Sequence, residues 1–244
     1  LKHGVYWQNE IEFYPEGIEI DIEEDEEEDE ELSFSTGKEI IEEEDKQEEG
    51  KSVESEIYSL NKDNGRGTLN IIEDTFEMDK QAIVFCSSRK GAEKSADRSA
   101  KLIKDKISRE DRNELKEYSE RILNVLGSPT SQCKRLAESV KKGTAFHHAG
   151  LLNQQRQLVE EAFREGLIKT ISATPTLAAG VNLPAFRVVI RDLKRYTGQG
   201  MDFIPVLEYE QMTGRAGRPK YDDRGEAISV AKQPGMKDDI LDRY

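Results

Sequence analysis

Short apolar segments alternate with helical patterns through most of the chain. Residues 81–86, 168–173, 187–190 and 227–231 are apolar or β-branched runs of strand length, and residues 144–146 add a shorter one. Between them, residues 90–107, 131–142 and 153–165 carry apolar side chains at helical spacing. Strands that alternate with helices of this length build parallel β-α-β units. The sequence therefore predicts an α/β fold, a parallel sheet flanked by helices, with ligands gathering at the carboxyl ends of the strands.

The negative charge of the chain is concentrated in one segment. Residues 19–56 contain 20 acidic residues and three lysines, whereas the whole chain has a net charge of −14, so the remainder is mildly basic. A block of like charges repels itself and buries too little apolar surface to fold alone. We expect residues 1–20 to form a linker and hairpin, residues 21–68 an acidic, mobile insertion, and residues 69–244 the globular domain. A partner-binding or nucleic-acid-mimicking acidic segment is the alternative interpretation of the insertion.

Several classes of protein are disfavoured by composition. The two cysteines, Cys86 and Cys133, have no pairing pattern, so we expect a reduced, intracellular and cytoplasmic protein. No apolar run is long enough to span a membrane, and no signal peptide opens the chain. Adjacent histidines, His147 and His148, point in opposite directions and have no cysteine nearby, so we expect no metal site. Because the first residue is Leu1, the chain reads as a piece of a longer protein.

Residues 211–219, with the sequence QMTGRAGRP, carry the most specific chemical signal. Arg215 and Arg218 stand three residues apart, a spacing that places two side chains on one face of a helix. Guanidinium groups bind phosphate oxygens in bidentate geometry and stay charged at any working pH. This is the chemistry that phosphoryl transfer needs at its developing charge. The alternative is a surface helix with two solvated arginines.

Three further loops follow predicted strands. Residues 87–91 combine hydroxyls and cations at a helix amino terminus, which suits a phosphate group, although an ordinary helix cap explains them equally. Residues 146–151, with the sequence FHHAGL, suggest a polar loop touching a nucleic-acid backbone. Residues 172–185 combine small residues with the Thr174 and Thr176 hydroxyls, which could bind a phosphodiester or simply allow a helix to pack tightly on the sheet.

Taken together, these four segments resemble motifs IV, IVa, V and VI of superfamily-two DExH helicases, in the family's order and spacing. Within that superfamily they resemble the Ski-type branch, and most closely the archaeal Hjm/Hel-type DNA helicases that act in DNA repair. The resemblance covers about residues 69–232. It implies the second of two RecA-like domains, with ATP bound in the cleft between the two domains and single-stranded or forked DNA running across both.

The resemblance also implies roles for individual residues. Arg215 and Arg218 would face the γ-phosphate, and Gln211 would position the phosphate or the attacking water. Gly180 and Asn182 would link the nucleotide to the strand-binding loop. The residues expected to hold the nucleic-acid backbone are Ser88, Arg89, His148, Thr174 and Thr176.

Residues 193–203 lie between the last two motifs. Gly198 and Gly200 predict the tip of a hairpin. In the similar DNA helicases a hairpin at this place separates the duplex strands, and apolar or aromatic side chains are suited to that role. The candidate strand-separating residues are Arg195, Tyr196, Met201 and Phe203. A plain surface hairpin whose aromatic side chains pack on their own domain is the alternative.

The chain lacks half of the expected catalytic machinery. Residues 45–52 match only the tail of a phosphate-binding P-loop, because Asp45 stands at the first glycine position and no strand precedes it. ATP and Mg²⁺ would then be bound chiefly by an upstream RecA-like domain. We therefore expect this chain alone to be inactive, and the full-length protein to be a monomeric ATP-dependent helicase with 3′-to-5′ polarity. An RNA-directed Ski-type helicase and a non-catalytic interaction module on a RecA-like scaffold remain alternatives.

Overall fold

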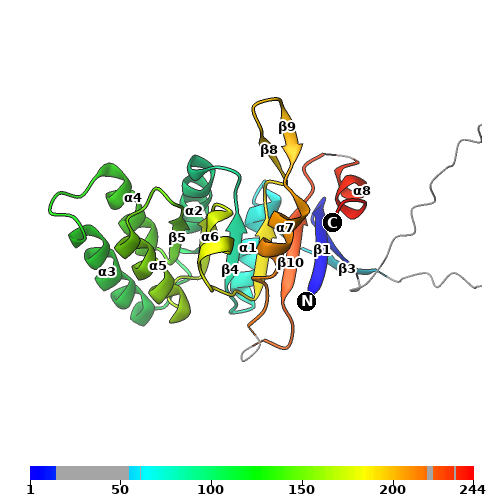
Figure 1. The fold of residues 1–244 in the computed structure, drawn as a ribbon. Helices are drawn as coiled ribbons and strands as arrows, with labels where there is room; N and C mark the ends of the chain where they lie inside the picture. Colours follow the sequence, from blue (N-terminus) through cyan, green and yellow to red (C-terminus); the bar gives the residue numbers. More distant parts are fainter. Residues whose placement is uncertain (15–54, 61, 219–221, 234) are drawn as a thin grey trace, which may run out of the picture.

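The computed structural model describes residues 1–14, 55–60, 62–218, 222–233 and 235–244. An eight-stranded sheet has the order β3-β2-β1-β10-β7-β4-β6-β5. Its strands are β1 (Lys2–Trp7), β2 (Glu10–Tyr14), β3 (Glu56–Ser59), β4 (Ala82–Phe85), β5 (Thr144–His147), β6 (Thr170–Ala173), β7 (Arg187–Ile190) and β10 (Glu226–Val230). The helices are α1 (Gly67–Glu77), α2 (Arg89–Ile103), α3 (Arg109–Asn124), α4 (Ser131–Val140), α5 (Asn153–Arg164), α6 (Thr176–Gly180), α7 (Val206–Thr213) and α8 (Met236–Leu241). A separate two-stranded hairpin, β8 (Lys194–Tyr196) and β9 (Met201–Phe203), projects beyond the rest of the domain (Figure 1).

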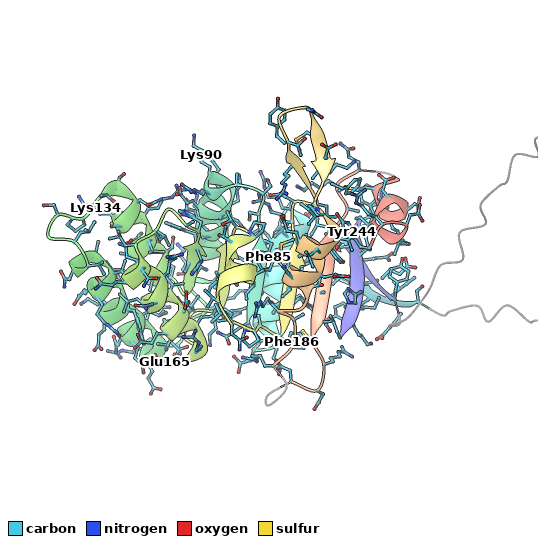
Figure 2. All side chains as sticks on the ribbon, viewed as in Figure 1. Phe85, Lys90, Lys134, Glu165, Phe186 and Tyr244 are labelled. Carbon is cyan, nitrogen blue, oxygen red and sulfur yellow. The ribbon has the colours of Figure 1, made fainter. Side chains whose placement is uncertain are left out.

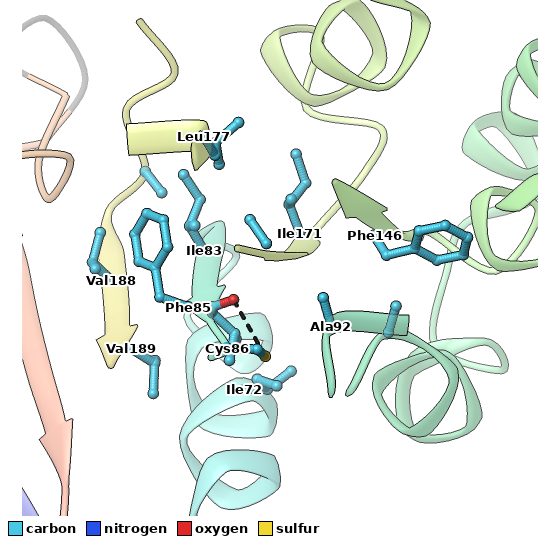
Figure 3. Close-up of a cluster of buried hydrophobic side chains, with 14 of the residues drawn as sticks. Ile72, Ile83, Phe85, Cys86, Ala92, Phe146, Ile171, Leu177, Val188 and Val189 are labelled. Atoms are coloured by element: carbon cyan, nitrogen blue, oxygen red, sulfur yellow. Dashed lines mark hydrogen bonds between the residues drawn. The ribbon is translucent and has the colours of Figure 1, made fainter. Parts of the chain in front are cut away.

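The predicted α/β fold is confirmed. The strands β5, β6, β4, β7 and β10 are parallel neighbours, and their side chains are fully buried because helices cover both faces of the sheet. Figure 3 shows this core, with Ile72 of α1 and Ala92 of α2 on one side of the strands and Leu177 of α6 on the other. The Ser108 hydroxyl caps α3, accepting a hydrogen bond from the Asp111 backbone N–H at 3.0 Å.

The amino-terminal hairpin is part of the same sheet. Gln8 and Asn9 have φ of 48° and 70°, the left-handed conformation of a two-residue hairpin turn. β1 then pairs in parallel with β10, and β2 is antiparallel to both of its neighbours, so the sheet is mixed rather than purely parallel. The fold thus begins at β1, not only near residue 69.

Most of the expected acidic insertion lies outside the described residues. Its described part, residues 55–60 and 62–68, forms β3 and the first residues of α1. All four residues of β3 are exposed, because the strand pairs through its backbone at the edge of the sheet. Pairing of this kind leaves no apolar pattern in the sequence, which explains why β3 was not predicted.

The two edges of the central strands carry different segments. Lys90, just after β4, marks the carboxyl edge, where the β8–β9 hairpin also emerges (Figure 2). Phe186, just before β7, marks the opposite, amino edge. This separation sets the geometry of the candidate sites.

Candidate functional site

A cavity of about 540 Å³ lies at the carboxyl edge of the sheet. It collects residues that follow four parallel strands, β4, β5, β6 and β7, together with residues of α7. Four of the five residues predicted to hold a nucleic-acid backbone line it: Ser88, Arg89, Thr174 and Thr176. Strand ends that are far apart in sequence therefore meet at one surface, as expected for a parallel sheet.

Local hydrogen bonds hold the polar groups of this cavity in place. The Ser88 side chain caps α2 by accepting a hydrogen bond from the Gly91 backbone N–H at 3.1 Å, and its own O–H remains able to donate. The hydroxyls of Thr174 and Thr176 lie 2.9 Å apart. Arg89 begins α2 and is exposed at the cavity wall. Hydroxyl donors and one guanidinium at a helix amino terminus form a surface suited to phosphate oxygens.

The structure does not place the His148 side chain at this cavity. Its ring is fully buried, stacks on Phe146 at 5.4 Å between ring centroids, and accepts a hydrogen bond at Nδ1 from the Gly150 backbone N–H. Burial lowers the pKa of His148, in spite of the nearby Glu93 carboxylate. His148 therefore stabilises the fold of the loop from inside, and direct contact with nucleic acid is not supported.

The neighbouring His147 points the other way, as expected from its position on a strand. Its Nε2 lies 2.9 Å from the Glu160 carboxylate in a buried pair. Burial lowers the pKa of His147, while Glu160 opposes that shift. The two histidines thus face different partners.

The arginine segment differs from the expectation of one helical face. α7 ends at Thr213, where Gly214 follows, and Gly217 has φ of 91°, a conformation that favours glycine. Ala216 instead forms a short parallel bridge with Ala185, just before β7 begins. The two guanidinium groups therefore diverge to different partners, and they lie toward the amino edge of the sheet rather than at its carboxyl ends.

Arg215 joins the other predicted nucleotide-binding segment. Its Nη1 donates to the Asn182 side-chain oxygen at 3.2 Å, and its Nη2 donates to the Ala178 carbonyl at the end of α6. Gly180 is the last residue of that helix and is exposed. The Nε of Arg215 is buried and has no hydrogen-bond partner among the described residues. Buried donors are normally satisfied, so this group is suited to an anionic acceptor.

Arg218 is bound within its own domain. Its Nε and Nη2 donate to the Asp222 carboxylate at 2.8 and 3.1 Å, and its Nη1 donates to the Gln81 side-chain oxygen at 2.8 Å. Lys80 binds the same carboxylate at 2.7 Å. Burial alone would raise the pKa of Asp222, but the hydrogen bonds from Arg218 and Lys80 lower it. Arg218 thus shares a carboxylate, whereas Arg215 faces only neutral acceptors.

Gln211 faces a different part of the domain from Arg215 and Arg218. It is exposed on α7 and lines the carboxyl-edge cavity together with Thr174 and Thr176. The predicted group of Gln211, Arg215 and Arg218 is therefore not assembled in this structure. The residues that the structure does bring together are Arg215 and Asn182.

The β8–β9 hairpin presents two of its four predicted residues to solvent. Tyr196 and Met201 are paired across the strands and are 71% and 62% exposed. Arg195 is held at the base by an ion pair with Glu208 at 2.7 Å. Phe203 packs edge-on against Tyr244 at 6.4 Å. The exposed wedge surface is thus confined to Tyr196 and Met201, because the other two side chains fix the hairpin to the domain.

Two ionic groups that support these sites were missed by sequence reasoning. Arg187, only 1% exposed, binds the carboxylates of Glu226 and Asp74. Asp192, at the end of β7, accepts hydrogen bonds from the Ser87 backbone N–H and from Arg191. Burial opposes ionisation of Asp192, but its cationic partners lower its pKa to about 2. The sequence did contain a signal for these two ionic groups, because both charged residues lie in or next to an apolar strand. A charge that is buried at such a position must be paired.

Comparison with known proteins is consistent with this geometry. Residues 114–220 match the helicase conserved C-terminal domain. Together with the parallel sheet and its covering helices, this match supports a helicase C-terminal domain of RecA-like fold. Within the described residues, no helix has the length and apolarity needed to cross a membrane.

Several curated relatives are proteins of Pyrococcus and Methanocella species. Over 176 residues the chain is 46% identical to the ATP-dependent DNA helicase Hel308 of Pyrococcus horikoshii and 47% identical to that of Pyrococcus abyssi, and each alignment covers 71% of this chain and 24% of the relative. Identity to the Hel308 of Methanocella arvoryzae is 43% over 176 residues, covering 72% of this chain and 24% of the relative. The chain thus spans about a quarter of the length of the curated relatives it matches.

Proposed function

We propose that the chain is the second RecA-like domain of a Ski-type, ATP-dependent DNA helicase that moves 3′ to 5′ and acts in DNA repair or at replication forks. The Hel308 relatives, named as ATP-dependent DNA helicases, support DNA as the substrate. The observation that carries the proposal is the placement of Arg215, which pairs with Asn182 through Nη1, whereas its buried Nε–H has no acceptor among the residues that the structure describes. An upstream RecA-like domain of the same polypeptide is the required partner.

Arg215 is the residue best placed to meet the terminal phosphate of ATP. Its guanidinium is held by a carbonyl and an amide oxygen, and neutral acceptors leave its positive charge available. Asn182 fixes the orientation of that side chain, and Gly180 ends the helix that supplies the carbonyl. Bound ATP with Mg²⁺ would supply the γ-phosphoryl group, whose transfer to water would release ADP and phosphate and drive movement along DNA. An arginine in this role stabilises charge that develops on the phosphoryl oxygens.

Arg218 acts beside Arg215 in this proposal. The Asp222 carboxylate neutralises much of its charge in the present arrangement. Arg218 therefore contributes to the phosphate only after at least part of its contact with Asp222 is exchanged for the nucleotide. Arg215 exchanges only contacts with neutral acceptors, which leave its charge uncompensated among the described residues, so its removal should have the larger effect.

The carboxyl-edge cavity binds the backbone of the tracked DNA strand. Ser88, Thr174 and Thr176 offer hydroxyls, and Arg89 offers a charge, to phosphate oxygens that carry no sequence information. Gln211 lies on α7 between this cavity and the arginine segment. It is suited to sense whether DNA is bound while the nucleotide occupies the other site.

A comparison of two variants of the full-length protein tests whether the nucleotide and the DNA bind at separate sites. Arg215→Ala should lower DNA-stimulated ATP hydrolysis by about 10³-fold or more, with affinity for single-stranded DNA unchanged. Arg89→Ala should weaken single-stranded DNA binding and reduce its salt slope by roughly one unit, with ATP hydrolysis in the absence of DNA unchanged. The isolated chain should hydrolyse no ATP. If each variant lost both ATP hydrolysis and single-stranded DNA binding, the proposal of two separate sites would be refuted.

A further inference from the structure

A second cavity, of about 530 Å³, lies on the other side of the carboxyl edge. It is bounded by the start of α1, the outer surface of α2 and the ends of β7 and β10. We call it the basic cleft, after the five cations that line it alongside a single carboxylate, Asp192: Arg66, Lys94, Arg98, Arg191 and Lys232. None of the expectations from sequence used this surface.

Three of these cations are not neutralised by any of the described residues. Asp192 binds both Arg191 and Lys232, which accounts for the one negative charge in the cleft. The side chains of Arg66, Lys94 and Arg98 make no hydrogen bond or ion pair with any residue that the structure describes. Uncompensated cations around a cavity raise the local concentration of polyanions and bind them on contact.

The beginning of α1 adds backbone donors to the same cleft. Arg66 is the N-cap residue, and no side chain caps this helix terminus. Gly67 allows the terminus to lie against Tyr6, since a Cβ at this position would stand 2.0 Å from the Tyr6 ring. Gly67, Thr68 and Leu69, the first residues of this 11-residue helix, line the cleft beside the cations, so the positive end of the helix dipole lies at its wall.

The cleft and the first cavity lie on either side of the root of the hairpin. Asp192 lines both cavities, and β8 begins two residues later at Lys194. The β8–β9 hairpin, which carries the exposed Tyr196 and Met201, thus projects from the edge that the two cavities share (Figure 1). A duplex opened at this hairpin would have a phosphate-binding surface on each side.

We infer that the basic cleft binds backbone phosphates of the second DNA strand, the one displaced at the hairpin. This inference rests on the proposed function, because it takes the first cavity as the site of the tracked strand. The two cavities then keep the separated strands apart, and re-annealing behind the hairpin is opposed. Phosphate contacts of this kind are independent of sequence.

The double variant Lys94→Ala/Arg98→Ala tests the inference in the full-length protein. Both residues lie on the outer surface of α2, and neither supports the core. Lys101→Ala/Lys104→Ala is the matched control, since it removes two cations from the same helix and its carboxyl end, outside the cleft. Fluorescence anisotropy measures affinity for a duplex with a 3′ tail only and for a fork with both tails, over a range of salt concentrations.

The cleft variant should bind the 3′-tailed duplex as the wild-type protein does. Its affinity for the fork should fall on the order of tenfold at ~0.1 M salt. The slope of the logarithm of the binding constant against the logarithm of the salt concentration should be smaller in magnitude by about two. The control double variant should leave both affinities unchanged. Equal losses on both substrates, or a control variant that behaves like the cleft variant, would overturn the inference. A failure of the proposed function is recognised separately, because Arg215→Ala would then leave ATP hydrolysis intact.

Discussion

Replacing Arg187 with methionine should destabilise the domain by about 3 kcal/mol. The guanidinium is 1% exposed and connects three elements, donating to Glu226 at 2.8 Å, to Asp74 at 2.7 Å and to Thr75 at 2.9 Å. Methionine fills a similar volume but offers no charge. The substitution therefore leaves the Glu226 carboxylate, itself 1% exposed, without its principal partner.

The magnitude follows from what remains around the two carboxylates. Removing one member of a buried ion pair costs about 3–5 kcal/mol, because the other charge stays buried. Arg224 still contacts Glu226 at 3.2 Å, and the Tyr58 hydroxyl still donates to Asp74 at 3.0 Å. These contacts place the cost at the lower end of that range.

Urea unfolding of the 244-residue chain measures the effect. With a slope of roughly 2 kcal/mol/M, a loss of about 3 kcal/mol lowers the midpoint by about 1.5 M. Arg121→Met is the matched control, because the Arg121 and Glu161 side chains are 50% and 45% exposed and such pairs contribute at most about 1 kcal/mol. The double variant Arg187→Met/Glu226→Leu should recover most of the loss. A midpoint for Arg187→Met that equals that of Arg121→Met would refute the reasoning.

Three further predictions concern the sites. Because the pKa of Asp192 is lowered to about 2, its carboxylate stabilises the fold by roughly 2 kcal/mol above pH ~4, and this stabilisation is lost as the pH falls toward 2. Asp192→Asn should therefore lower the midpoint of urea unfolding at pH 7 far more than at pH 2.5. An equal lowering of the midpoint at both pH values would contradict the shift of this pKa. Gly217→Ala should lower the free energy of unfolding by about 1 kcal/mol or more, because φ is 91° and a Cβ would lie 3.2 Å from a neighbouring backbone atom. Gly200→Ala is the control and should cost less, because open space surrounds that position. Equal losses of unfolding free energy in the two variants would argue against backbone strain at residue 217. Tyr196→Ala/Met201→Ala in the full-length protein should slow duplex unwinding several-fold while DNA-stimulated ATP hydrolysis persists, and unchanged unwinding would remove the wedge role.

The central strands could be predicted because their signal is local. β4, β6 and β7 are continuous apolar runs, which a strand buried on both faces requires. The loops that follow these strands then had to meet at one edge, and the cavity that holds Arg89 and Thr174 confirms that inference. The alternation of strand and helix patterns in the sequence was sufficient to predict this part of the fold.

The parts that were not predicted depend on partners distant in sequence. β3 is exposed on every residue and exists because β2 lies beside it. The orientation of His148 depends on Phe146 and Gly150 within the folded loop. The divergence of Arg215 and Arg218 had a local signal, since Gly214 and Gly217 both interrupt a helix, but their partners Asn182 and Asp222 are set by the folded chain.

The affinity of the full-length protein for ADP with aluminium fluoride and Mg²⁺, a mimic of the phosphoryl group in transfer, tests the central proposal about Arg215 most directly. Arg215→Ala should weaken binding of this mimic on the order of 10³-fold, while affinity for ADP alone stays within about threefold. Arg164→Ala, a surface arginine that is 54% exposed, serves as the control and should change neither affinity. Unchanged binding of the mimic by Arg215→Ala would contradict the assignment of this guanidinium to the nucleotide site.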